Sequence, residues 1–333
     1  MDWPICIGEC RGHSKSFITH LSKKYILANI SYNESNMIIP QKLNQGDKVA
    51  LIATARYISE SELLPAVKII ENWGLKIVYG KNIYKKYNQF AGTESERAAD
   101  LQKMLDRQDI KAIFCVRGGY GTVKIIDSVD FNFFLKYPKW IVGYSDITVL
   151  HNHINNLGIA TLHATMPINF FSNTKKSLDA TRRCLFEVKN KVVASSNLLN
   201  RFGQVEGEIV GGNLSVIYSL LGSDSDLIVE DKILFIEDLD EYLYHVDRMT
   251  VNLLRNKKFS SIKALIVGSM TKMNDNPIPF GKTANQIISD SIMNFDFPVC
   301  FDFPSGHLDN NNPIIFGKPS RLCINESSTE LLQ

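Results

Sequence analysis

The feature that most constrains the fold is an alternation of short apolar runs with capped helical stretches. Residues 48–54, KVALIAT, have the length of a strand, and Ser59 with Glu62 forms a capping-box pattern that predicts a helix start. Apolar residues then recur three or four positions apart until Gly74, after which LKIVYG returns to strand character. This order predicts a β-α-β unit with parallel strands.

The same order repeats further along the chain. Thr93 and Glu96 form a second capping pattern, and residues 110–116, IKAIFCV, read as the next strand. The second half carries predicted strands at 233–238, 262–269 and 298–303, and predicted helices near 241–255 and 283–294. We therefore predict two α/β lobes: an N-terminal lobe with a mostly parallel sheet covered by helices, and a smaller C-terminal lobe that is α/β or β-rich.

The length of 333 residues predicts about two domains. We expect residues 1–36 to be a disordered or non-native leader, with Met37 as the natural start. Residues 37–170 are expected to form the first domain and residues 205–333 the second. Between them, 171–204 are rich in Ser, Asn, Lys and Thr, which is typical of a linker.

The composition excludes several classes of protein. A net charge of +2 gives no broad field for nucleic acid, and no apolar run is long enough for a membrane span. No secretory signal is recognisable and the six cysteines are scattered, so we expect reduced thiols and a cytoplasmic location. Cys6, Cys10, His13 and His20 match no standard zinc spacing, and we expect neither metal nor cofactor.

Two strand ends in the first lobe carry candidate chemistry, because ligands of open α/β sheets collect at the carboxyl ends of strands. The first is CVRGGYGT, residues 115–122, where Gly118, Gly119 and Gly121 let the backbone turn and direct N–H groups at an anion. The spacing is not that of a nucleotide-binding loop. A plain turn is the simpler interpretation.

The second is WIVGYSDITVLH, residues 140–151, which places Ser145 between a buried strand and a helix start. That position resembles a nucleophile elbow, which exposes a hydroxyl and places the next residue's N–H for oxyanion binding. The stretch departs from G-x-S-x-G because Ile147 replaces the second glycine. A helix N-cap is the alternative role for this serine.

A nucleophilic serine needs a base, and the histidines are the candidates. His307 lies on the loop FPSGHLDNNNP, just past a predicted strand. His151 and His153, two apart on a helix, do not share a face and are not expected to hold a metal together. His163 is expected to be buried and hydrogen-bonded, and His245 to have a surface or core role.

The base also needs an orienting carboxylate, and Glu237 and Asp238 follow the strand ILFI directly, with Asp240 and Glu241 close behind. Paired carboxylates could instead serve a glycosidase or hold a divalent metal. A solvated acidic helix N-terminus is the third interpretation.

Together these stretches resemble one family, the LD-carboxypeptidases of murein recycling, whose relatives include the microcin immunity peptidases. The resemblance covers roughly residues 38–325. The stretches that carry it are GDKVALIAT, VRGGYGT, WIVGYSDITVLH, GEIVGGNLSVIYSLLGS, ILFIEDLDEYLYHVDRM and FPSGHLDNNNP, in the family's order.

The resemblance implies a serine carboxypeptidase that removes the terminal D-alanine from the cytoplasmic tetrapeptide stem of recycled cell-wall fragments. It implies Ser145 as nucleophile, His307 as general base and Glu237 as the carboxylate that orients the base. The backbone N–H groups of Asp146 and of Gly118 or Gly119 would bind the oxyanion. It further implies a homodimer acting on small muropeptides, without nucleic acid or membrane partners.

The substrate-binding residues are less defined than the catalytic ones. Arg117 could clamp the substrate's free carboxylate, and Tyr144 is a second candidate for substrate contact, whereas Arg248 has a structural role in this interpretation. Glu241, Tyr242 and Tyr244 are expected to be packing or pocket wall; LHATMP and PIIFG depart from the family's usual His-Gly-Pro and Pro-Leu-Gly turns. The alternatives are a microcin-immunity-like peptidase acting on a peptide-nucleotide, and a non-catalytic muropeptide-binding protein.

Overall fold

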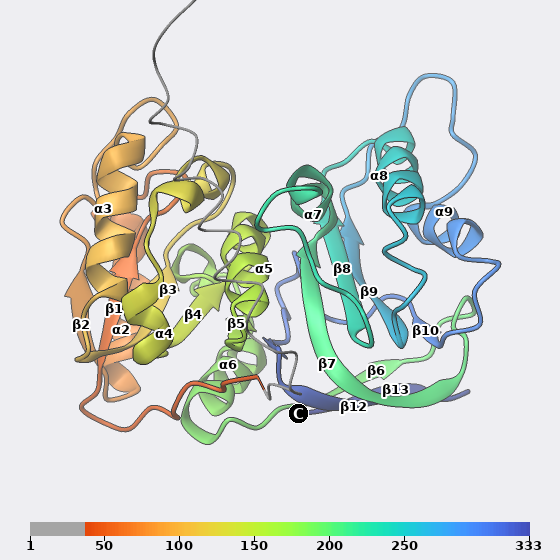
Figure 1. The fold of residues 1–333 in the computed structure, drawn as a ribbon. Helices are drawn as coiled ribbons and strands as arrows, with labels where there is room; N and C mark the ends of the chain where they lie inside the picture. The colour runs from red at the N-terminus through yellow and green to blue at the C-terminus, as the bar shows by residue number, and fades with distance from the viewer. Residues whose placement is uncertain (1–36) are drawn as a thin grey trace, which may run out of the picture. The chain divides into compact units, whose positions relative to one another are not determined.

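The predicted β-α-β repeat forms a six-stranded sheet in the computed structural model, which describes residues 37–333 (Figure 1). The predicted leader, with its cysteines and histidines, lies outside the described residues. In sheet order the strands are β11 (Ile314–Phe316), β5 (Thr161–His163), β4 (Trp140–Gly143), β3 (Ile110–Cys115), β1 (Lys48–Ile52) and β2 (Lys76–Tyr79). All neighbours pair in parallel except β11 with β5.

The capping residues begin both helices as predicted. The Ser59 side chain accepts a hydrogen bond from the Glu62 amide at the start of α2 (Glu60–Asn72), and the Glu62 carboxylate accepts one from the Ser59 amide. Thr93 and Glu96 make the same reciprocal pair at the start of α3 (Glu94–Leu105). Each box satisfies two backbone N–H groups that a helix start leaves unpaired.

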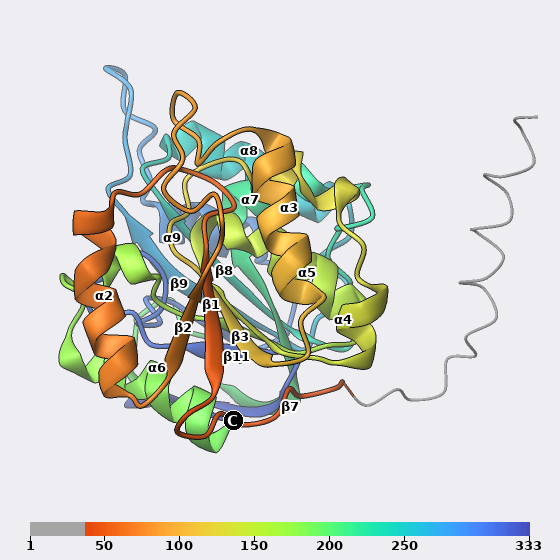
Figure 2. The ribbon, with the colours of Figure 1, turned by 90° about the vertical axis from the view of Figure 1, so that its left-hand side faces the viewer.

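Helices cover both faces of this sheet (Figure 2). Val49 and Leu51 of β1 belong to the core beneath α2 and α6 (Lys175–Glu187), whereas Ala50 and Ile52 belong to the core on the other face. That second core is covered by α3, α4 (Asn132–Lys136) and α5 (Thr148–Asn156). Burial of successive residues on opposite faces explains the continuous apolar runs.

The second lobe is built on a mixed seven-stranded sheet, so it is not smaller in strand number than the first. In sheet order its strands are β10 (Val299–Cys300), β9 (Ala264–Thr271), β8 (Ile233–Leu239), β7 (Gly203–Asn213), β12 (Pro319–Ile324), β13 (Ser328–Leu332) and β6 (Lys191–Ser195). From β10 to β7 the strands are parallel, and from β7 to β6 they are antiparallel. Helices α7 (Leu214–Leu220), α8 (Leu243–Arg255) and α9 (Ala284–Ser291) pack on the parallel half.

The segment 171–204 contains more regular structure than its composition indicates. It forms α6, which buries Ala180, Cys184 and Leu185 at helical spacing, and β6, which pairs with β13. The polar residues between these positions make the apolar face hard to recognise in the sequence.

Strand β11, from near the end of the chain, returns to the first sheet beside β5. Residues 37–333 form one compact unit, and the predicted domain limits within it remain a prediction.

Four short 3₁₀ helices complete the described elements: η1 (Thr122–Lys124), η2 (Ile126–Ser128), η3 (Ser145–Ile147) and η4 (Pro167–Asn169). Two of them, η1 and η3, adjoin the stretches that carry the candidate chemistry. No helix within residues 37–333 has the length and apolar character needed to cross a bilayer.

Candidate functional site

Ser145 lies at a strained turn between β4 and α5. Its φ of 62° is left-handed, a conformation that residues other than glycine rarely adopt and that recurs at functional sites. Gly143 ends β4 beneath it, and a Cβ there would lie 2.8 Å from Ile147 Cγ1. Because the Ser145 hydroxyl makes no hydrogen bond within residues 37–333, it does not serve as a helix cap.

Buried polar groups connect two turns: the glycine turn, residues 118–121, and the elbow at Ser145. The Asp146 carboxylate accepts a hydrogen bond of 2.9 Å from the Thr122 amide. The buried Arg97 guanidinium donates to the carbonyl oxygens of Thr54 and Gly121, at 2.6 and 2.8 Å. Burial raises the pKa of Asp146, and its hydrogen bonds and the Arg97 charge oppose that shift. The turn and the elbow are thus held as one assembly.

Three amide groups near Ser145 are free to bind an anion. The N–H groups of Gly118, Gly119 and Asp146 donate to no acceptor within residues 37–333. A Cβ on Gly118 would lie 3.2 Å from Ser145 Cβ and 3.4 Å from its Oγ, so this glycine directly faces the serine. Gly118 and Asp146 are buried residues, and since buried amides are normally paired, free ones beside a hydroxyl are typical of an oxyanion site.

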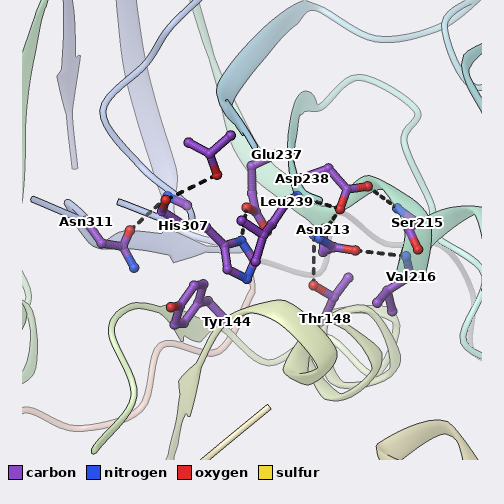
Figure 3. A network of polar contacts seen from close by, with 12 residues as sticks. Tyr144, Thr148, Asn213, Ser215, Val216, Glu237, Asp238, Leu239, His307 and Asn311 are labelled. Atoms are coloured by element: carbon purple, nitrogen blue, oxygen red, sulfur yellow. Dashed lines mark hydrogen bonds and ion pairs between the residues drawn. The ribbon is translucent and has the colours of Figure 1, made fainter. Parts of the chain in front are cut away.

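Glu237 on β8 and His307 on the loop between β10 and β11 lie side by side (Figure 3). His307 Nδ1 lies 2.6 Å from Glu237 Oε2, and the Glu237 carboxylate is fully buried near the end of β8. Gly306 makes this approach possible, because its φ is 117° and a Cβ there would lie 2.7 Å from Glu237 Oε2. The carboxylate accepts a hydrogen bond from the Nδ1–H group, which leaves Nε2 available as a base.

The surroundings of His307 set its acidity. Burial lowers the pKa of its imidazole, but the charge and hydrogen bond of Glu237 and the charge of Asp238 outweigh that effect, so the pKa is raised overall. The Tyr144 ring packs against His307 with centroids 4.7 Å apart, and its hydroxyl donates to Asn169 Oδ1 at 3.2 Å. Tyr144, expected to contact substrate, is thus a buried support for the imidazole.

Asp238, the next residue along β8, faces a different set of partners (Figure 3). Its Oδ1 accepts hydrogen bonds from Asn213 Nδ2, at 2.8 Å, and from the backbone N–H of Leu239. Its Oδ2 accepts one from the backbone N–H of Ser215 at 2.9 Å. The backbone N–H of Asn213 in turn donates to Thr148 Oγ1 on α5 at 2.9 Å. Burial, and then the Glu237 charge, raise the pKa of Asp238 to about 7. This network joins the helix after Ser145 to the strand that carries Glu237.

We expect Gly212→Ala to weaken this junction strongly. Gly212 has a φ of 138°, and a Cβ there would lie 2.3 Å from Thr148 Oγ1. Backbone strain and overpacking together predict a loss of about 3 kcal/mol in the free energy of unfolding, measured by urea denaturation. Gly222→Ala is the matched control, because Gly222 also has a positive φ, 80°, but open space around it. Equal losses in the two variants would contradict the steric argument.

The remaining sequence candidates lie in local contacts. Arg117 Nη1 donates to the Tyr57 carbonyl at 3.0 Å and lies 3.5 Å from Glu62 Oε1. His245 pairs with Glu241. His151, His153 and Arg248 also pack locally: His151 bonds Thr161 and Gly143, His153 bonds Ser225, and Arg248 lies over Tyr244.

The expectation for His163 is half wrong. The residue is fully buried, but neither ring nitrogen has a hydrogen-bond partner within residues 37–333. The reason is its surroundings, which are the rings of Tyr144, His151, Phe235 and Phe316. No group of three or more His, Cys, Asp or Glu side chains in the described part of the chain is arranged to hold a metal ion.

Sequence reasoning missed the polar residues that connect the two halves of the site. Thr148 and Asn213 lie within stretches that carry the resemblance and Arg97 does not, but no local pattern assigns a role to any of the three, because their roles depend on long-range contacts. One signal was available: two consecutive glycines precede Asn213 in VGGN, and paired glycines can mark a close approach of two backbones.

Comparison with known proteins agrees with this architecture. Residues 49–164 match the LD-carboxypeptidase N-terminal domain, and residues 206–322 match the LD-carboxypeptidase C-terminal domain. A probable murein peptide carboxypeptidase of Bacillus subtilis is 34% identical over 302 residues, covering 87% of this chain and 92% of its own. The Microcin C7 self-immunity protein MccF of Escherichia coli is 25% identical over 271 residues, covering 71% of this chain and 79% of its own.

A solved structure shows the same fold. The muramoyltetrapeptide carboxypeptidase from Oxalobacter formigenes superposes with a TM-score of 0.79 at 24% identity, covering 86% of this chain and 98% of its own. Both domains match in order, and they contain the Ser145 elbow, the glycine turn and the Glu237–His307 pair. The chain is therefore a peptidase that belongs to the LD-carboxypeptidase family.

Proposed function

We propose that this peptidase removes the terminal D-alanine from murein tetrapeptides, cleaving the bond between the L-centre of the diamino acid and D-Ala. The observation that carries the proposal is the His307–Glu237 hydrogen bond of 2.6 Å, together with the strained Ser145 elbow that faces Gly118. The name of the Bacillus subtilis relative supports a murein peptide as substrate. As the family resemblance implies, we also propose a cytoplasmic homodimer.

In this mechanism Ser145 Oγ attacks the scissile carbonyl carbon while His307 Nε2 takes the hydroxyl proton. The amides of Gly118 or Gly119 and of Asp146 donate to the oxyanion of the tetrahedral intermediate. His307 then gives its proton to the D-Ala nitrogen as the C–N bond breaks, and water hydrolyses the acyl-enzyme by the same steps. Glu237 holds the Nδ1 proton and stabilises the imidazolium throughout.

The geometry of Ser145, His307 and Glu237 is compatible with this role. Ser145 and His307 make no hydrogen bond to each other within residues 37–333. Contacts between a nucleophile and its base commonly shorten when substrate binds. Both partners are positioned by independent contacts, Ser145 by the elbow and His307 by Glu237 and Tyr144.

The test is mass-spectrometric detection of free D-alanine from murein tetrapeptide incubated with the protein. The same peptide ending in L-alanine is the stereochemical control. An aminoacyl sulfamoyl adenosine is the third substrate, because a solved structure of the microcin-immunity protein MccF holds a compound of this class. Release of D-alanine alone supports the proposal. Cleavage of the adenosine compound without D-alanine release would replace it with the microcin-type peptidase.

Gly118→Ala should lower turnover while the protein remains folded. The added methyl would lie 3.1 Å from Met166 Cε and 3.2 Å from Ser145 Cβ, so it displaces the serine slightly. A misplacement of about 1 Å can cost about 10²-fold in kcat, so this smaller displacement predicts a loss of about 10-fold. Gly207→Ala, on β7, is the matched control, because its nearest neighbour is the flexible Lys263 side chain at 3.3 Å. Equal kcat values for the two variants would refute the role of the glycine turn.

A further inference from the structure

Arg56 lies directly across the glycine turn. Its backbone N–H donates to the Gly118 carbonyl at 3.4 Å, four residues after the end of β1. A Cβ on Gly119 would lie 2.4 Å from Arg56 Cδ and 3.3 Å from its Nε. The arginine side chain therefore runs over Gly119, while the adjacent Gly118 faces Ser145. The two consecutive glycines place a cation and a hydroxyl at the same turn.

Of the arginines near this turn, Arg56 is the one whose guanidinium has no bonding partner among residues 37–333. Within residues 37–333 it makes no ion pair and donates no hydrogen bond, and the residue is exposed. The two neighbouring arginines differ. Arg117 is held by the Tyr57 carbonyl and by Glu62, and Arg97 is buried and bonded to two carbonyl oxygens. Only Arg56 of these three can bind a ligand without losing an internal partner.

We propose that Arg56, and not Arg117, binds the free carboxylate of the substrate's terminal residue. The inference rests on the proposed function. In a carboxypeptidase substrate a single α-carbon separates the scissile nitrogen from that carboxylate, so its ligand must lie beside the oxyanion turn. The planar guanidinium of arginine matches a carboxylate with two parallel hydrogen bonds. Arg56 is thus a specificity-determining residue that restricts cleavage to the last peptide bond.

The test compares two substrates, the tetrapeptide ending in D-alanine and the same peptide ending in D-alaninamide, which lacks the carboxylate. We expect wild-type protein to prefer the acid, and Arg56→Met to lower kcat/KM for the acid roughly 10- to 100-fold, mainly through KM, with little change for the amide. Arg56→Lys should recover part of the preference. Arg321→Met, an exposed arginine on β12, is the control and should keep the wild-type preference.

Each contrary outcome is distinct. An equal loss on both substrates would show that Arg56 only supports the turn, and would overturn the proposal. Loss of the acid preference in Arg117→Met instead of Arg56→Met would assign the carboxylate to Arg117. If the wild-type protein prefers the acid over the amide, that result establishes the carboxypeptidase activity, whatever the Arg56 variants show. Wild-type protein that releases no D-alanine refutes the proposed function, and the assignment of Arg56 with it.

Discussion

Ser145→Ala is expected to lower kcat for D-alanine release by about 10⁶-fold, the loss typical of removing the nucleophile of a serine peptidase. Alanine keeps the Cβ and the left-handed backbone of residue 145, so the elbow should persist. The lost hydroxyl makes no hydrogen bond within residues 37–333, and its removal should not change stability. Circular dichroism and steady-state kinetics on tetrapeptide test both expectations together.

His307→Ala should cause a loss of similar size, and the double variant should be no worse than either single variant. Residues that act in one chemical step are not additive, because removing one leaves the other without its function. A fluorophosphonate probe adds a second readout, since it should label Ser145 in wild-type protein and fail to label the alanine variant. A folded Ser145→Ala protein that keeps the wild-type rate would overturn the assignment of the nucleophile.

Glu237→Gln should lower kcat by about 10⁴-fold and shift the pH profile. The glutamine amide can donate to Nδ1 and stabilise the wrong tautomer of His307, which explains the size of the loss. The base works only as neutral imidazole, so activity is lost as pH falls through the pKa of His307. In the wild type that pKa is raised, because Glu237 and Asp238 outweigh the effect of burial, so the midpoint should lie above 6.5.

Without the Glu237 charge, burial against the Tyr144 ring dominates, and the midpoint should move to lower pH. Asp238→Asn is the matched control, because it removes an adjacent charge but leaves the Nδ1 hydrogen bond intact. Its midpoint should move less than that of Glu237→Gln. Identical profiles for the wild type and Glu237→Gln, measured as kcat/KM from pH 5 to 9, would exclude Glu237 as the partner of the base.

The network between Asn213, Asp238 and Thr148 explains how residues from two sheets can share one site. Glu237 and Asp238 are neighbours on β8, and side chains of successive strand residues point to opposite faces. One carboxylate therefore reaches His307 and the other reaches Asn213 (Figure 3). The strand carries one carboxylate for the base and a second that is tied to the helix after Ser145.

The sequence by itself determined the local elements of this protein. The capping pairs at Ser59 and Thr93 and the apolar spacing after them predicted α2 and α3, because caps and helical faces depend on residues a few positions apart. The motif stretches also predicted the family, which the two domain matches confirm. Near-neighbour patterns were sufficient for both.

Only the tertiary structure decided which distant groups meet. The helix within 171–204 and the return of β11 to the first sheet depend on packing partners far away in the chain. The same holds for the contacts on which the proposal for Arg56 rests, since Arg117 is engaged by Glu62 and the Tyr57 carbonyl, which no local pattern reveals. Local propensity acts over one helical turn, whereas a site assembled from two sheets is fixed by strand register and by burial of the surfaces between them.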